Sequence, residues 1–258
     1  MSLDSMKEIF DRMEQEGKPF WEIVLETDME ERQVTRSQSM AKMLLTWQAM
    51  ADAADNYTGR RRSVSGLVGG DGMKMRQYCF RDEAMSGGYV SEVIAEALSM
   101  AESNACMGRI VAAPTAGACG VLPAVLLPLC KYEELTQHQL LEALYVAAGI
   151  GSIIAYKASI AGASGGCQAE IGTASAMAAG ALVALRGGEG EQIGHAVAMA
   201  LKNLMGLVCD PVAGLVEVPC VKRNVIGAVN AVSAADMALA GIESRIPVDE
   251  VIDAMGEV

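Results

Sequence analysis

Charged side chains are distributed unevenly along this chain of 258 residues. Residues 1–62 carry 21 of them, whereas residues 105–242 carry only 16 in more than twice the length. A long segment with so little charge is better buried than hydrated, so we expect residues 105–242 to form the apolar core. We expect residues 1–62 to be a charged, helical outer segment.

The apolar residues available for that core are mostly small or aliphatic. Apolar types make up 52% of the chain, but aromatic types only 4%. Few runs alternate between polar and apolar residues, and no strand–helix–strand pattern recurs along the chain. We therefore predict a mainly α fold, in which one multi-helix domain covers residues 1–258 and Gly- and Pro-rich loops join the helices.

Local signals place several of the helices. Thr136 is a suitable N-cap and Gln139 follows three residues later, which predicts a helix over about 137–157. Glycines close two further helices, because this residue favours the left-handed conformation that ends a helix. The other predicted helices run from Cys167 to before residue 187, from Glu191 to about Met205, from near Cys220 to Ala240, and onward from Pro247.

Composition also bears on what the chain binds. The formal net charge is −12, which argues against a nucleic-acid groove and an anionic membrane surface. The only basic run, residues 60–62, is interpreted as a solvated loop or a partner contact. The first thirty residues lack the pattern of a secretory signal, so we expect a cytoplasmic protein with reduced thiols.

Residues 110–130 contain no charged side chain and are as long as a bilayer span. However, Pro114, Pro123 and Pro128 lie within them, and prolines interrupt the hydrogen-bond ladder of a helix. We therefore interpret this segment as an interrupted part of the core.

Three of the seven cysteines, Cys167, Cys209 and Cys220, lie at breaks between predicted helices. Their spacing matches no standard zinc or ferredoxin pattern, and free cysteine is often a buried apolar filler. However, Cys167 and Cys220 fall in the first turn of predicted helices, where free N–H groups stabilise a thiolate. Gly165 and Gly166 would also let the backbone approach a ligand closely. On this evidence a metal site and buried filler both stay open.

Four segments, residues 104–117, 164–172, 209–214 and 219–224, resemble the α chain of iron-sulfur L-serine dehydratase. The resemblance implies a lyase that converts L-serine to pyruvate and ammonia. It also implies a 4Fe-4S cluster on Cys167, Cys209 and Cys220, a separate β subunit and an oligomeric assembly. Family α chains usually continue past the point where this sequence stops, so a truncated C-terminus is an open interpretation.

The reaction requires removal of the α proton and expulsion of the β hydroxyl, for which a cluster iron would act as a Lewis acid. For the substrate carboxylate the candidates are Thr115, Ser164 and the backbone of Gly117, Gly165 and Gly166, although capping and turn formation would also account for them. Weak candidates for the base are Lys157, Lys202 and His195, and the β chain is an equal alternative.

Two other functions stay open on sequence grounds. The first is a pyridoxal-phosphate dehydratase, with Lys157 as the Schiff base and residues 164–166 around the phosphate. The second is a noncatalytic helical scaffold, in which the cysteines are filler and the glycines serve helix packing.

Overall fold

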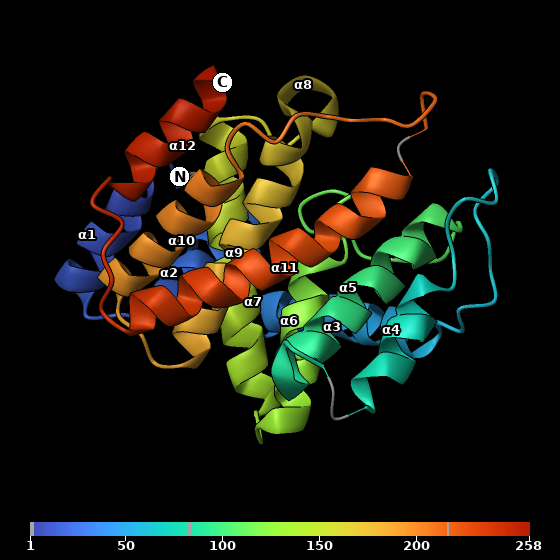
Figure 1. The fold of residues 1–258 in the computed structure, drawn as a ribbon. Helices are drawn as coiled ribbons and strands as arrows, with labels where there is room; N and C mark the ends of the chain where they lie inside the picture. Colours follow the sequence, from blue (N-terminus) through green and yellow to red (C-terminus); the bar gives the residue numbers. More distant parts are fainter. Residues whose placement is uncertain (1–2, 82–83, 216) are drawn as a thin grey trace.

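Helices account for all the regular structure in the computed structural model, which describes residues 3–81, 84–215 and 217–258 (Figure 1). No strand occurs in these ranges, only an isolated bridge between Val212 and Leu215. The predicted mainly α fold is therefore confirmed. The helices are α1 (Met6–Glu16), α2 (Phe20–Arg32), α3 (Arg36–Asp55), α4 (Asp71–Cys79), α5 (Gly87–Ala105), α6 (Val121–Tyr132), α7 (Gln137–Lys157), α8 (Gly162–Cys167), the π-helical turn η1 (Gln168–Gly172), α9 (Thr173–Leu185), α10 (Gly190–Leu204), α11 (Val218–Leu239) and α12 (Val248–Glu257).

Helix α9 lies at the centre and packs against α7, α10 and α11 (Figure 1). All of its residues from Thr173 to Val183 are buried. Such a helix needs small side chains, because large ones would hold its neighbours apart. Gly180 shows how close the packing is: a Cβ there would lie 2.2 Å from Ile150 Cδ1 of α7.

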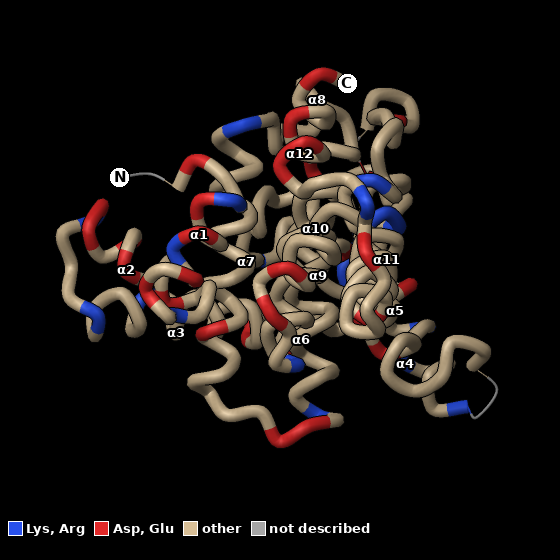
Figure 2. Tube along the Cα trace, turned by 90° about the vertical axis from the view of Figure 1, so that its left-hand side faces the viewer, with Lys and Arg blue, Asp and Glu red and all other residues tan. Residues whose placement is uncertain are grey.

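The charged helices α1 to α3 lie on the outside of the fold (Figure 2). Helix α2 packs against α7, and its apolar residues Phe20, Ile23, Val24 and Leu25 are buried. Gly149 of α7 provides the space for this contact, since a Cβ there would lie 2.5 Å from Val24 Cγ2. Apolar packing therefore attaches this charged segment to the core.

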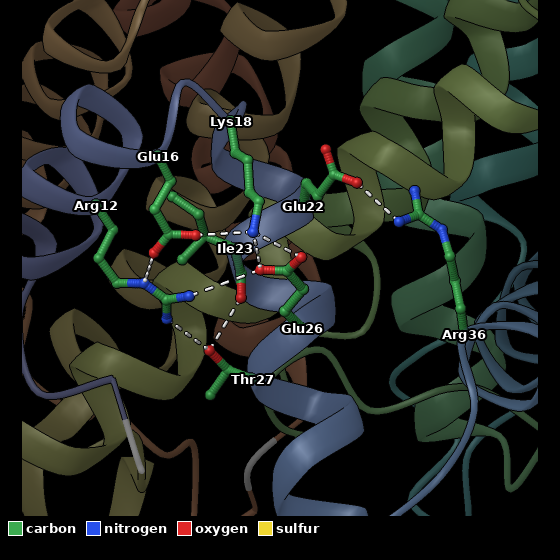
Figure 3. Close-up of polar contacts among 8 residues, drawn as sticks. All are labelled: Arg12, Glu16, Lys18, Glu22, Ile23, Glu26, Thr27 and Arg36. Atoms are coloured by element: carbon green, nitrogen blue, oxygen red, sulfur yellow. Dashed lines mark hydrogen bonds and ion pairs between the residues drawn. The ribbon is translucent and has the colours of Figure 1, made fainter.

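The outward face of α1 and α2 carries a network of ion pairs (Figure 3). Arg12 Nε is 2.8 Å from Glu16 Oε1, and Lys18 Nζ lies 2.8 Å from both Glu16 and Glu26. Because these groups are in contact with solvent, the pairs contribute little to the stability of the fold. The network links α1, the loop after it and α2.

The predicted helix boundaries agree closely with the structure. The helix expected over 137–157 is α7, and Thr136 and Gln139 form the predicted capping box. Helices α10 and α11 end just before Gly206 and Gly241, whose φ angles are +87° and +85°. Helix α12 follows Pro247, and its apolar residues Val248, Val251, Ile252 and Met255 are buried.

The uncharged segment 110–130 is not one continuous helix. Residues 110–120 form a loop, and α6 begins at Val121. Pro123 lies in the first turn of α6, where a missing N–H costs little, and only Pro128 lies inside the helix. The interpretation as an interrupted core segment is confirmed, because most of α6 is buried.

Helix α7 is the one helix in the described ranges that is long and apolar enough to cross a membrane, and 67% of its most apolar window is buried inside the protein. Burial of this kind is also found in the core helix of a globular fold. The segment for which the sequence raised the membrane question is therefore not the one that meets the length criterion.

The packing of α7 against α9 gives a test of the fold. Changing fully buried Ile150 to Ala should lower the free energy of unfolding by about 2–5 kcal/mol, because it removes apolar contacts and leaves a cavity. Leu45 is 60% exposed, so Leu45→Ala should change it by less than about 0.5 kcal/mol. Urea unfolding measures both. Equal effects of the two substitutions would contradict the buried position of α7.

Candidate functional site

Gly166 creates the position that Cys167 occupies. Its φ of +70° and ψ of −168° break the helical path, so that Cys167 opens the helical run through η1 to α9. A Cβ at residue 166 would lie 3.2 Å from the amide nitrogen of Cys209. The glycine therefore permits both the turn and the approach of the loop that carries Cys209.

Gln168 holds the same loop from the other side. Its amide donates to the Leu207 carbonyl over 2.9 Å, and its side-chain oxygen accepts from the Gly206 amide over 2.7 Å. These bonds, together with Gly166, place residues 206–209 against the start of the helical run that follows Cys167. Two distant parts of the sequence are thus joined by one main-chain and one side-chain hydrogen bond.

Cys220 completes the group of cysteines from the first turn of α11, as the sequence predicted. The thiol of Cys220 hydrogen-bonds to the sulfur of Cys167, and the nearby Cys209 raises the pKa of Cys220. The structure therefore brings Cys167, Cys209 and Cys220 into one region, which we call the thiol site. In the described ranges, however, no three Cys, His, Asp or Glu side chains converge on a single metal-ion position.

The thiol site favours one thiolate. The hydrogen bond from Cys220 lowers the pKa of Cys167 to about 6, against the opposing effect of burial, and a hydrogen bond from Arg223 adds to the lowering. The pKa of Cys220 is raised, because it is the donor in this pair and is itself desolvated. Arg223 Nη1 lies 2.9 Å from Cys167 Sγ and 2.8 Å from the Val208 carbonyl oxygen.

Glu170 is a neighbour of the thiol site that the sequence did not identify as functional. Thr115 donates its hydroxyl to Glu170 Oε1. The carboxylate lies between two glycines: a Cβ on Gly117 would be 2.7 Å from Oε1, and one on Gly162 would be 2.8 Å from Oε2. Its charge raises the pKa values of Cys167 and Cys220. The sequence did offer one indication of a special role for Glu170, since no other charged residue occurs in residues 158–185.

Asn224 connects the thiol site to the loop that carries Thr115. Its side chain is fully buried. The amide nitrogen donates to the carbonyls of Gly117 and Cys220 over 2.7 and 2.9 Å, and the oxygen accepts from the Gly120 amide over 2.9 Å. A buried amide with three such bonds fixes the position of the loop relative to α11.

The candidate substrate-binding residues divide into two groups. Thr115 and Gly117 adjoin Glu170, and Gly166 contacts the loop of Cys209. Ser164 is exposed and bonds locally to Ser159, with 2.7 Å between the hydroxyl oxygens. The local hydrogen bonds of Ser164 are those of a turn residue. A Cβ on Gly165 would lie 2.6 Å from Ala169 Cβ, so this glycine serves close packing.

The three weak candidates for the base lie apart from these contacts. Lys157 is ion-paired with Asp249 and Asp253 over 3.4 and 3.0 Å. Burial lowers the pKa of Lys157, but the hydrogen bond to Asp253 and the charge of Asp249 together raise it by more, so the net shift is upward. Lys202 is exposed, and His195 Nδ1 accepts a 3.4 Å hydrogen bond from the Ser244 amide. Within the described residues none of the three bonds to the thiol site or to Glu170.

The fold and the site together define an all-helical protein in which cysteines from three separate segments meet beside a carboxylate. The chain belongs to the serine dehydratase alpha chain family, whose family model matches residues 15–258.

Relatives cover nearly the whole chain. It is 44% identical to a probable L-serine dehydratase alpha chain of Bacillus subtilis, over 98% of this chain and 85% of that one. It is 40% identical to the L-serine dehydratase alpha chain of Peptoniphilus asaccharolyticus, over 99% of this chain and 88% of that one. L-serine dehydratase TdcG of Escherichia coli is 39% identical over 82% of this chain and 48% of its own length. The resemblance drawn from the sequence motifs is therefore confirmed.

The role of Asn224 can be tested by its removal. Asn224→Ala leaves the Gly120 amide and the Gly117 carbonyl without partners, so the free energy of unfolding should fall by about 1–3 kcal/mol. Asn203 is a matched control, because it is exposed and its side chain bonds only to Asn230 within the part of the chain that the structure describes. Asn203→Ala should cost less than about 0.5 kcal/mol. Denaturant titration measures both, and an unchanged midpoint for Asn224→Ala would refute the connecting role.

Proposed function

We propose that this chain is the catalytic α subunit of an L-serine dehydratase, which converts L-serine to pyruvate and ammonia with a 4Fe-4S cluster bound at the thiol site. The observation that carries the proposal is the convergence of Cys167, Cys209 and Cys220 beside Glu170 and Thr115. Membership of a serine dehydratase family supports the reaction. A separate β subunit, an oligomeric assembly and a cytoplasmic location belong to the same proposal.

The chemistry of the thiol site fits such a cluster. Thiolates are the usual ligands of iron–sulfur clusters, and the pKa of Cys167 is lowered towards the thiolate form. A four-iron cluster binds its thiolates through different irons, so the ligands need not converge on a single point. Arg223 donates to Cys167, and Cys220 lies in the first turn of α11. Both features compensate negative charge at the site.

Cys167, Cys209 and Cys220 would hold the cluster, which when bound would supply a Lewis acid for the substrate hydroxyl. The protein must then provide a group that accepts the proton from the substrate Cα. Glu170 is suited to this, because its Oε1 is held by Thr115 and its Oε2 has no hydrogen-bond donor in the described ranges. We assign Oε2 as the proton acceptor.

The steps balance without a redox partner. Glu170 accepts the Cα proton and passes it to the departing β hydroxyl, which leaves as water and gives aminoacrylate. The imine tautomer of aminoacrylate is then hydrolysed to pyruvate and ammonia. One water is released and one is consumed. The bond from Thr115 keeps the carboxylate aimed at the substrate, and Asn224 holds the loop of Thr115 in place.

The pyridoxal-phosphate alternative has less support. It requires Lys157 as a neutral amine that can form a Schiff base. The carboxylates of Asp249 and Asp253 pair with this amine, and its pKa is raised. A protonated, ion-paired lysine is a poor nucleophile, so no observation favours this function.

The cysteine assignment predicts the iron content of variants. Cys167→Ala, Cys209→Ala and Cys220→Ala should each lose bound iron and activity, because a ligand is missing. Cys79→Ala and Cys130→Ala should keep both, since among the described residues these thiols bond only to main-chain carbonyls. The measurement is anaerobic iron and sulfide analysis with a pyruvate assay, with and without a β chain. Full iron content in any of the first three variants would refute the ligand assignment.

The assignment of Glu170 predicts a different result. Glu170→Gln should retain the iron of the unmodified protein but lose at least about 100-fold in kcat, because the amide cannot accept the proton. Glu170→Asp should recover part of the rate. Unchanged kcat in Glu170→Gln would show that another group, from this chain or from a β subunit, is the base.

A further inference from the structure

A cavity of about 300 Å³ lies between the end of α3, the loop that follows it and the end of α5. The α3–α4 loop lies beside this end of α5 in Figure 1. The polar lining consists mainly of Asp52, Asn56, Arg61, Glu102 and Arg109. None of the thiol-site cysteines is among the lining residues, and neither is Glu170.

Two arginines of this lining lack acidic partners. In the described ranges, neither Arg61 nor Arg109 forms a hydrogen bond or ion pair through its guanidinium. Their situation differs from that of Arg62, which donates to the carbonyls of Gly59 and Arg61, and from that of Arg76, which lies 2.6 Å from Glu96. Uncompensated guanidinium groups at a cavity favour an anion, and a carboxylate matches their fork of donors.

The buried acid of the cavity does not neutralise these arginines. Glu102 is only 1% exposed. Its carboxylate accepts from the Tyr57 hydroxyl and from the amides of Gly70 and Asp71, the latter two over 3.0 and 2.8 Å. The start of α4 therefore compensates its charge. Arg61 and Arg109, which are both exposed, therefore keep a positive charge that Glu102 does not balance.

Asp52 supplies a charge of the opposite sign. It lies on α3 at the same cavity, and its carboxylate has no partner in the described part of the chain. Two guanidinium groups and one carboxylate around a small space match the two charges of an α-amino acid. We propose that this cavity is a second ligand site, which binds a small α-amino acid through Arg61 and Arg109 to its carboxylate and Asp52 to its ammonium group.

L-Alanine is a suitable probe, because it has both charged groups but no hydroxyl to eliminate. Isothermal titration calorimetry on the full chain should show saturable binding of L-alanine. Arg61→Gln and Arg109→Gln should each weaken it at least about tenfold, as expected for loss of a charge-assisted hydrogen bond. Arg60→Gln is the matched control, since Arg60 adjoins Arg61 in sequence but does not line the cavity. Asp52→Asn should weaken the binding of L-alanine more than that of acetate.

Binding measurements on further variants distinguish this site from the thiol site. Binding retained in Cys167→Ala supports the proposal, whether or not that variant holds iron. Binding lost in Cys167→Ala would assign L-alanine to the thiol site and overturn it. Equal affinity in the unmodified protein, Arg61→Gln and Arg109→Gln would also overturn it, as would the absence of saturable binding. Circular dichroism melting curves check that each variant is folded.

Discussion

The position of Thr115 and Glu170 beside the thiol site depends on one set of buried hydrogen bonds, which Asn224 makes with Gly117, Gly120 and Cys220. This side chain joins the first turns of α11 to the loop before α6, two segments about a hundred residues apart in the chain. Because separating a buried amide from its partners costs free energy, these hydrogen bonds hold α11 and the loop before α6 in one relative position. Thr115, and through it Glu170, are placed by the same loop.

Glycine is the second constraint, and its role at the site is steric. Gly117 and Gly162 leave the space that the Glu170 carboxylate fills, and Gly166 admits the loop of Cys209. An added Cβ at any of these positions would meet atoms of the site itself. These glycines therefore leave the room that three chain segments need in order to meet. Gly166 also adopts a backbone conformation that favours glycine.

Much of the fold could be predicted from the sequence, because its signals are local. The capping box at Thr136 and the glycines that close α10 and α11 act within a few residues, and these helices begin and end where expected. The approach of the Cys209 loop to Cys167 depends on Gly166 and Gln168, which are distant from Cys209 in the sequence. Glu170 was missed for the same reason, since its partner Thr115 lies 55 residues away. The sequence around Lys157 gave no indication that this lysine would be ion-paired with Asp249 and Asp253, which are distant in the chain.

The most direct test of the account is the position of iron in crystals of the anaerobically prepared protein, measured by anomalous diffraction at the iron absorption edge. We predict a single compact anomalous peak bounded by the sulfurs of Cys167, Cys209 and Cys220, on the side that faces Glu170. Iron bound at any other cysteine, or anomalous signal absent from the thiol site in protein that contains iron, would contradict it.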